Sequence, residues 1–259
     1  MKAIYLSVLS PGLSYRATAA TVNRNFNLNL RHSTIEEWVR KYIPLISEYV
    51  NSFVPQSTGV WHADELFLNV NDPHSIREEG RKIAYLWDII DRGTRFLNAS
   101  RLERRHNAKA AKKAFQYAVD VTHGQDPEII LTDKLPSYNV AIPQVFKDRP
   151  TQPQHIRRGL KLKKGEQPYK DLRIQRIERV HGTLRDRYKI MRNLKKLDSP
   201  VPEGERIHYN FVRSHMALQG QTPALRADID KPPAEIKNKW GYLIAKAVEY
   251  QRSKIQKEL

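Results

Sequence analysis

The sequence predicts an α/β protein in which a mixed sheet of five strands with flanking helices follows an all-helical N-terminal region. Three observations lead to this fold class. Residues 1–50 carry helix signals, residues 60–103 alternate between apolar and polar side chains as strands do, and helical and strand patterns take turns after residue 107. A helical region that precedes alternating strands and helices is typical of a chain with two structural units. The individual elements agree with this division.

The N-terminal region is predicted to form two short helices joined by a turn. Ser14 is the expected N-cap of a first helix that ends near Asn25. Ser33 with Glu36 three residues later has the spacing of a capping box for a second helix. Any small helical bundle gives this pattern, but it also fits a helix-turn-helix. The recognition face of such a motif would hold four side chains: Arg31, His32, Thr34 and Arg40.

Three strands are predicted next, in the segments VWHADELFLNV, KIAYLWDII and RFLNASRLE. The turn DRGT joins the second and third strands as a hairpin. In the first strand the alternation places Trp61, Ala63 and Glu65 on one face and Asp64 on the other. The segment from Pro55 to Gly59, which precedes these strands, is predicted to be a linker.

Helices and strands alternate through the rest of the chain. Asn107 is the expected cap of a helix that ends near His123, and the short strand EIILT, the helix SYNVAIPQVF and the strand QHIRR follow. A basic loop over 159–173 leads to the helix RIERVHGTLRDRYKIMRN. The resulting order, βββ-α-β-α-β-α, is that of the ribonuclease H-like fold. A last helix is expected to begin after the proline pair at 232–233.

This pattern divides the chain into three parts. We expect a helix-turn-helix DNA-binding domain at 1–54, a ribonuclease H-like catalytic domain at 55–220 and a helical extension at 221–259. The segment before the helix-turn-helix is short, which points to a start that is truncated relative to related chains.

The charge of the chain favours nucleic acid as a partner. The 259 residues include 45 Lys and Arg against 28 Asp and Glu, a net charge of +17. The excess is concentrated at 101–200, with 24 bases against 11 acids, whereas 56–100 has 5 against 7. A basic surface that is merely solvated would have a flatter distribution, so we favour a polyanion. The chain has no cysteine, which excludes disulfides and thiolate metal sites, and no apolar run approaches the roughly 18 residues of a membrane helix.

Three acids stand where the predicted fold could bring them together. Asp64 lies in the middle of the first strand, Asp133 follows the apolar run IIL, and Glu178 begins the basic helix beside Ile177. A carboxylate within an apolar strand is unfavourable unless it is paired or binds a metal. Structural readings remain for each of them, since Glu178 could form an ion pair with a neighbouring arginine. Two further acids compete for the site: Glu65 and Asp88.

Converging carboxylates need a cation, and hard oxygen ligands suit Mg²⁺ or Mn²⁺. We therefore expect Asp64, Asp133 and Glu178 to hold such a metal, with two ions about 3.5–4 Å apart as in other phosphoryl-transfer sites. Basic side chains around the third acid would neutralise an approaching DNA backbone. The candidates on this side of the chain are Arg157, Arg158, Lys161, Lys163, Lys164, Arg179, His181 and Arg185.

Several of these motifs together resemble the DDE-type insertion-sequence transposases, whose catalytic domain is ribonuclease H-like and integrase-like. The similar segments are GLSYRATAATVNRNF, STIEEWVRKY, WHADE, LTDKLPSY, IERVHGTLRDRYKIMR and HYNFVRSHMALQGQTPA, within about residues 11–228. The resemblance assigns the catalytic triad to Asp64, Asp133 and Glu178, and a basic residue seven positions later to Arg185. This chain departs from the family in the long spacing of 44 residues between the second and third acids, and in RSH where RPH is frequent.

The resemblance implies a metal-dependent enzyme that cleaves DNA at the ends of an insertion sequence and joins the freed 3′-OH to target DNA. It implies terminal inverted repeats and target DNA as partners, and a homodimer or higher oligomer in the prokaryotic cytoplasm, associated with the nucleoid. Copying and cut-and-paste pathways both stay open, as do Mg²⁺ and Mn²⁺. An inactive or repurposed DNA-binding remnant is the main alternative; a purely hydrolytic nuclease and a two-carboxylate glycosidase fit the helix-turn-helix and the charge less well.

Overall fold

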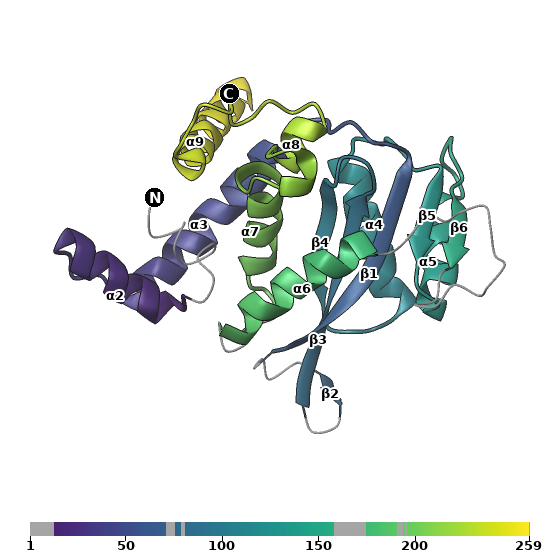
Figure 1. The fold of residues 1–259 in the computed structure, drawn as a ribbon, viewed down its shortest axis with the longest axis horizontal. Helices are drawn as coiled ribbons and strands as arrows, with labels where there is room; N and C mark the ends of the chain where they lie inside the picture. The colour runs from purple at the N-terminus through teal and green to yellow at the C-terminus, as the bar shows by residue number, and fades with distance from the viewer. Residues whose placement is uncertain are drawn as a thin grey trace.

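The computed structural model describes residues 13–70, 76–78, 81–157, 175–190, 194 and 196–258. Within these residues a twisted sheet has helices on both faces, and a second group of helices packs at its side (Figure 1). The predicted basic loop over 159–173 lies outside the described residues. No helix of the described part is long and apolar enough to cross a membrane.

The sheet is mixed. Its six strands are β1 (Val60–Asn69), β2 (Ile76–Glu78), β3 (Arg81–Asp91), β4 (Leu97–Glu103), β5 (Ile129–Thr132) and β6 (Gln154–Arg157). β1, β3 and β4 pair antiparallel, and β5 and β6 continue from β1 in parallel. The order β4-β3-β1-β5-β6 confirms the predicted ribonuclease H-like mixed sheet. The sixth strand, β2, also pairs with β3, and its three residues are too few to show an alternating pattern in the sequence.

Two apolar cores lie on opposite faces of the sheet because successive side chains of a strand alternate. Trp61 and Ala63 of β1 pack against α4 (Ala108–Val121) and α5 (Pro136–Phe146). Leu66 and Leu68 pack on the other face against α6 (Gln175–Ile190). The predicted alternation of β1 is therefore confirmed, and α6 is the helix that covers the Asp64 face.

The helices before the sheet are α2 (Tyr15–Phe26) and α3 (His32–Val50). Ser14 caps α2 as predicted, because its hydroxyl accepts a hydrogen bond from the Ala17 N–H at 3.2 Å. The predicted cap at Ser33 is wrong, since α3 begins at His32. The Asn23 amide bonds both backbone groups of Leu30 and so fixes the turn before α3. Whether this helix pair acts as a helix-turn-helix stays a prediction.

After α6 the chain returns past the sheet to α3. It forms α7 (Val201–Ile207), the π-helical turn η2 (His208–Val212), the 3₁₀ turn η3 (Met216–Leu218), α8 (Pro223–Arg226) and α9 (Lys239–Glu258). The last helix begins several residues later than predicted, because Ile236 and its neighbours form turns before it. Buried residues of α3, α7, η2 and α9 form a third apolar core, and α9 lies beside α3 (Figure 1).

Candidate active site

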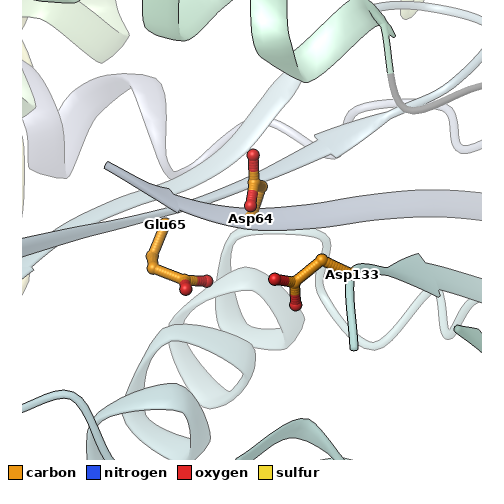
Figure 2. Close-up of side chains that lie close together, drawn as sticks. All are labelled: Asp64, Glu65 and Asp133. Atoms are coloured by element: carbon orange, nitrogen blue, oxygen red, sulfur yellow. The ribbon is translucent and has the colours of Figure 1, made fainter. Parts of the chain in front are cut away.

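Two carboxylates from separate segments meet where β1 and β5 run side by side. β1 carries Asp64, and Asp133 comes directly after the end of β5. The parallel register pairs His62 with Leu131, so two further residues along each strand bring Asp133 level with Asp64. Carboxylate oxygens of Asp64, Asp133 and Glu65 lie within 4.8 Å of one another (Figure 2). Sequence spacing predicted the first two members of this cluster.

Glu65 reaches the cluster from the other face of β1, as Figure 2 shows. The hydroxyl of Tyr138 donates to its Oε2 at 2.8 Å, and Nε2 of His106 lies 2.8 Å from its Oε1. Both carboxylate oxygens of Glu65 therefore contact side chains on the sheet face that α4 and α5 cover. Glu65 approaches the cluster from that face. The sequence predicted its opposite orientation, but neither His106 nor Tyr138 carried a signal that would have linked them to it.

The environment of Asp133 fits a cation. Burial raises the pKa of Asp133, a hydrogen bond from the Leu135 N–H lowers it, and the negative charges of Glu65 and Asp64 raise it further. The net rise in this pKa therefore reflects burial first and the negative charge of the two neighbouring carboxylates second. Carboxylate oxygens at this spacing are hard ligands suited to Mg²⁺ or Mn²⁺, so the residues present fit the predicted metal.

A second carboxylate faces Asp64 across the antiparallel pair. Asp88 of β3 is the register partner of Asp64, on the same face of the sheet, and it is fully buried. Like charges placed opposite each other destabilise a sheet. His181 of α6 lies between them, with Nδ1 3.3 Å from Asp64 Oδ2 and Nε2 3.0 Å from Asp88 Oδ2. The histidine therefore relieves the repulsion.

His181 carries a positive charge at neutral pH. Burial lowers its pKa, but the contacts with Asp64 and Asp88 raise it by more, to about 9. Its side chain is only 1% exposed. A side chain so deeply buried cannot touch DNA, so the prediction of a DNA contact at His181 is wrong. The signal was present in the sequence, because His181 falls between Ile177 and Leu184 in the apolar stripe of its helix.

Glu178 stands one helical turn before His181, in the first turn of α6, and is half-buried. Its carboxylate is not part of the cluster of oxygens within 4.8 Å, so the structure brings together Asp64 and Asp133 but leaves the third acid apart. Glu178 forms no ion pair within the part of the chain that the structure describes. The alternative of an ordinary ion pair with Arg179 or Arg185 is therefore not supported.

The residues predicted to contact DNA differ in how exposed their side chains are. Arg40 is half-buried and pairs with Glu36 and Asp198, at 3.1 and 3.3 Å. Thr34 is also half-buried, whereas the exposed members are Arg31, His32, Arg157, Arg179 and Arg185. The remaining candidates lie outside the described residues: Arg158, Lys161, Lys163 and Lys164. These contacts with DNA stay predictions.

The strand order is that of a ribonuclease H-like fold, with the two acids on β1 and directly after β5. The profile of the DDE domain family matches residues 58–201, more than half of the chain, and this range includes all three predicted acids. The chain belongs to this family, the DDE transposases.

Curated relatives agree with this membership. The transposase for insertion sequence-like element IS431mec of Staphylococcus aureus is 27% identical over 135 residues, which cover 52% of this chain and 54% of that protein. The transposase for insertion sequence element IS257 in transposon Tn4003, also from Staphylococcus aureus, has the same identity of 27% over 135 residues, again 52% of this chain and 54% of the relative. The chain thus spans about half the length of the curated relatives it matches.

Solved structures with a similar arrangement include integrases and transposases. The HTLV-2 integrase catalytic core domain in complex with magnesium is 14% identical, with a TM-score of 0.45 over 68% of this chain and 98% of that chain. The Mos1 strand transfer complex is 13% identical, with a TM-score of 0.26 over 59% of this chain and 57% of that chain.

Proposed function

We propose that this protein is a transposase that cleaves DNA at the ends of an insertion sequence and transfers the freed strand to target DNA. The observation that carries the proposal is the meeting of Asp64 and Asp133 at neighbouring strands, beside the helix that bears Glu178. Family membership and a net charge of +17 support DNA as the substrate.

The three acids divide the work of binding metal. Asp64 and Asp133 would hold Mg²⁺ or Mn²⁺, and Glu178 of α6 would be the third ligand. Such ions, when bound, would supply activation of the attacking oxygen and stabilisation of the leaving oxygen in phosphoryl transfer. His181 orients Asp64, and the exposed Arg185, seven residues after Glu178 and about 10 Å along the helix, positions a DNA phosphate.

Other regions bind and assemble the substrate. The helical region 1–54 recognises terminal inverted repeats through Arg31, His32, Thr34 and Arg40, the region 55–220 performs the chemistry, and 221–259 is a helical extension. Two element ends must be joined to one target, so we propose a homodimer or higher oligomer on DNA. Contacts with phosphates would position the DNA, and contacts with bases would select its sequence.

The test is strand transfer on labelled DNA that carries the repeats flanking the gene, with Mg²⁺, Mn²⁺ or EDTA. Wild type is compared with Glu178→Gln and with Asp186→Asn, an exposed acid on the same helix. Loss of an outer-shell partner of a metal ligand lowers activity 10–100-fold, so we expect Glu178→Gln to lower it by more than about 100-fold. DNA binding should persist in this variant, and Asp186→Asn should behave as wild type.

Two results would contradict the proposal. Full activity in Glu178→Gln would remove this residue from the metal site. DNA binding without cleavage in the wild type, under both metals, would indicate an inactive or repurposed remnant instead of a working transposase.

A further inference from the structure

A basic cavity lies beside the first two turns of α6. It has a volume of about 130 Å³, roughly ten times the ~10–15 Å³ that one water molecule needs. The hairpin between β3 and β4, the helix α6 and the chain after α7 contribute its walls. Its polar lining includes Arg95, Arg176, Arg179, Arg213, Tyr209 and His215.

Among the residues that the structure describes, no acidic side chain is part of this lining, and three of its arginines have no ion-pair partner. Arg95, Arg179 and Arg213 form no ion pair with any residue that the structure describes. Arg176 donates a hydrogen bond to the carbonyl oxygen of Arg92 and points its charge at the same region. Four arginines line this one small cavity, so an anion bound in it would interact favourably with several positive charges.

Arg95 lies in the turn between β3 and β4, where the backbone has a left-handed conformation. Its φ is 61°, in the left-handed region that a glycine or asparagine adopts with least strain. The N–H of Arg95 donates to the carbonyl oxygen of Asp91 at 3.0 Å, which fixes this conformation. The turn therefore fixes the backbone from which the Arg95 side chain reaches the cavity.

The remaining polar groups of the wall are uncharged. Burial lowers the pKa of His215 to about 4, partly offset by the contact of its Nε2 with the carbonyl oxygen of Tyr209 at 3.1 Å. Burial also raises the pKa of Tyr209 to about 12. The two rings touch edge to face, with centroids 4.5 Å apart. The cavity therefore has a neutral aromatic wall and a cationic rim.

The cavity is separate from the carboxylate site. Residues of an α-helix follow at about 100° intervals, which places Arg176, Arg179 and Thr183 on one flank of α6. The same geometry places Glu178 on the opposite flank, with Ile177 and Val180 packed on the sheet between the two. A DNA strand that crosses the beginning of α6 would meet both flanks.

We propose that this cavity binds one phosphate group of a DNA backbone and holds the strand that enters the carboxylate site. A phosphate is the ligand that several guanidinium groups recognise best, because each offers parallel N–H donors to two oxygens. The assignment of this phosphate to DNA rests on the proposed function. The contact is with the backbone, so it contributes to affinity and position and not to sequence preference.

The first experiment measures binding of fluorescent DNA by anisotropy in EDTA, at several salt concentrations. Arg213→Ala is compared with Arg213→Lys, and with Arg252→Ala, which removes an exposed charge from α9. We expect Arg213→Ala to weaken binding about tenfold and to reduce the slope of log affinity against log salt by about 1. Arg213→Lys should recover part of the affinity, and Arg252→Ala should change it less than about twofold.

Arg95→Gly is the second variant, because glycine accepts the positive φ and the hairpin should keep its fold. It should weaken DNA binding as Arg213→Ala does. Calorimetry with inorganic phosphate separates the two sources of the ligand. Phosphate binding that is lost in the variants while their DNA affinity is unchanged would make the cavity a site for free anions and overturn the proposal.

The outcome is independent of catalysis. Normal DNA affinity in both arginine variants overturns the proposed phosphate site, even if the wild type transfers strands. Weakened DNA binding in both variants, together with a wild type that never cleaves, supports the phosphate site and overturns the proposed transposase activity. A wild type that does not bind DNA overturns both proposals.

Discussion

Asp91 shows how one residue can position the surroundings of the site. Its carboxylate accepts hydrogen bonds from the backbone N–H groups of Thr58, Gly93 and Thr94, at 2.8 to 3.0 Å. It also accepts from the hydroxyl groups of Ser57, Thr58 and Thr94. The hairpin that presents Arg95 and the connection that leads into β1 are therefore held by the same buried carboxylate.

We predict that Asp91→Asn lowers the free energy of unfolding by about 3 kcal/mol, because the amide nitrogen would face donors where the carboxylate accepts bonds. Urea denaturation measures this difference. Asp230→Asn, at an exposed acid with no hydrogen bond among those of the described residues, serves as the control. Equal stability of the two variants would contradict the role of Asp91.

At the level of single residues, the sequence predicted the two acids whose positions are determined by the strands that carry them. Asp64 and Asp133 follow from the alternation of one strand and the end of another, and the parallel pairing then brings them together. Glu178 could be assigned to a helix, but the position of its carboxylate depends on how that helix packs. The contacts between His181 and Asp88 join distant segments, which no local pattern specifies.

At the level of elements, η2 connects the segment after α7 to the sheet. The Asn210 side chain accepts from the Leu97 N–H at 2.8 Å and donates to the Leu97 carbonyl oxygen at 2.9 Å. Phe211 packs edge to face on Phe96, next to it. The segment YNFVRSH thus uses its asparagine and phenylalanine for structure and presents Arg213 to the basic cavity.

His208, the first residue of η2, makes stability depend on pH. Burial, and after it the charges of Arg187 and Arg213, lowers its pKa from 6.5 to about 3. The unfolded chain therefore takes up a proton near pH 6.5, whereas the folded protein does not until about pH 3. By linkage, stability falls as pH decreases through this range, and it is not affected by this group above pH 7.

We predict that His208 accounts for a loss of about 1–2 kcal/mol in the free energy of unfolding between pH 7.5 and pH 5. Urea denaturation at both pH values would show it. The variant His208→Gln has no proton to gain, so the difference between the two pH values should shrink by that amount. An unchanged pH dependence in the variant would contradict the depressed pKa.

Elements were predictable where a local signal determines them. The caps at Ser14 and Asn107 are confirmed, since both side chains accept the expected backbone hydrogen bond. The start of α3 was missed because the Asn23 amide, and not a cap at Ser33, fixes the preceding turn. The start of α9 follows from packing against α3, which the proline pair before it does not indicate.

At the level of the whole molecule, the two ends of the described chain share one core. Ile43 and Ile46 of α3 pack with Trp240 and Leu243 of α9, together with Phe211 of η2. The ion pair between Lys254 and Glu48, at 2.9 Å, lies at the surface of the same contact. The helix α3, proposed to bind element ends, thus shares one core with α7, η2 and α9.

This shared core can be tested at Trp240, which is 1% exposed. We predict that Trp240→Ala lowers the free energy of unfolding by about 3–5 kcal/mol, the usual effect of removing a large buried side chain. Hydrogen exchange should also accelerate in α3, although the substitution is in α9. Ile255→Ala, at an exposed position of the same helix, should change neither quantity. If exchange in α3 stays slow while α9 loses its protection, α3 is stabilised by its contacts with α2 and α7, and the shared core with α9 does not determine its stability.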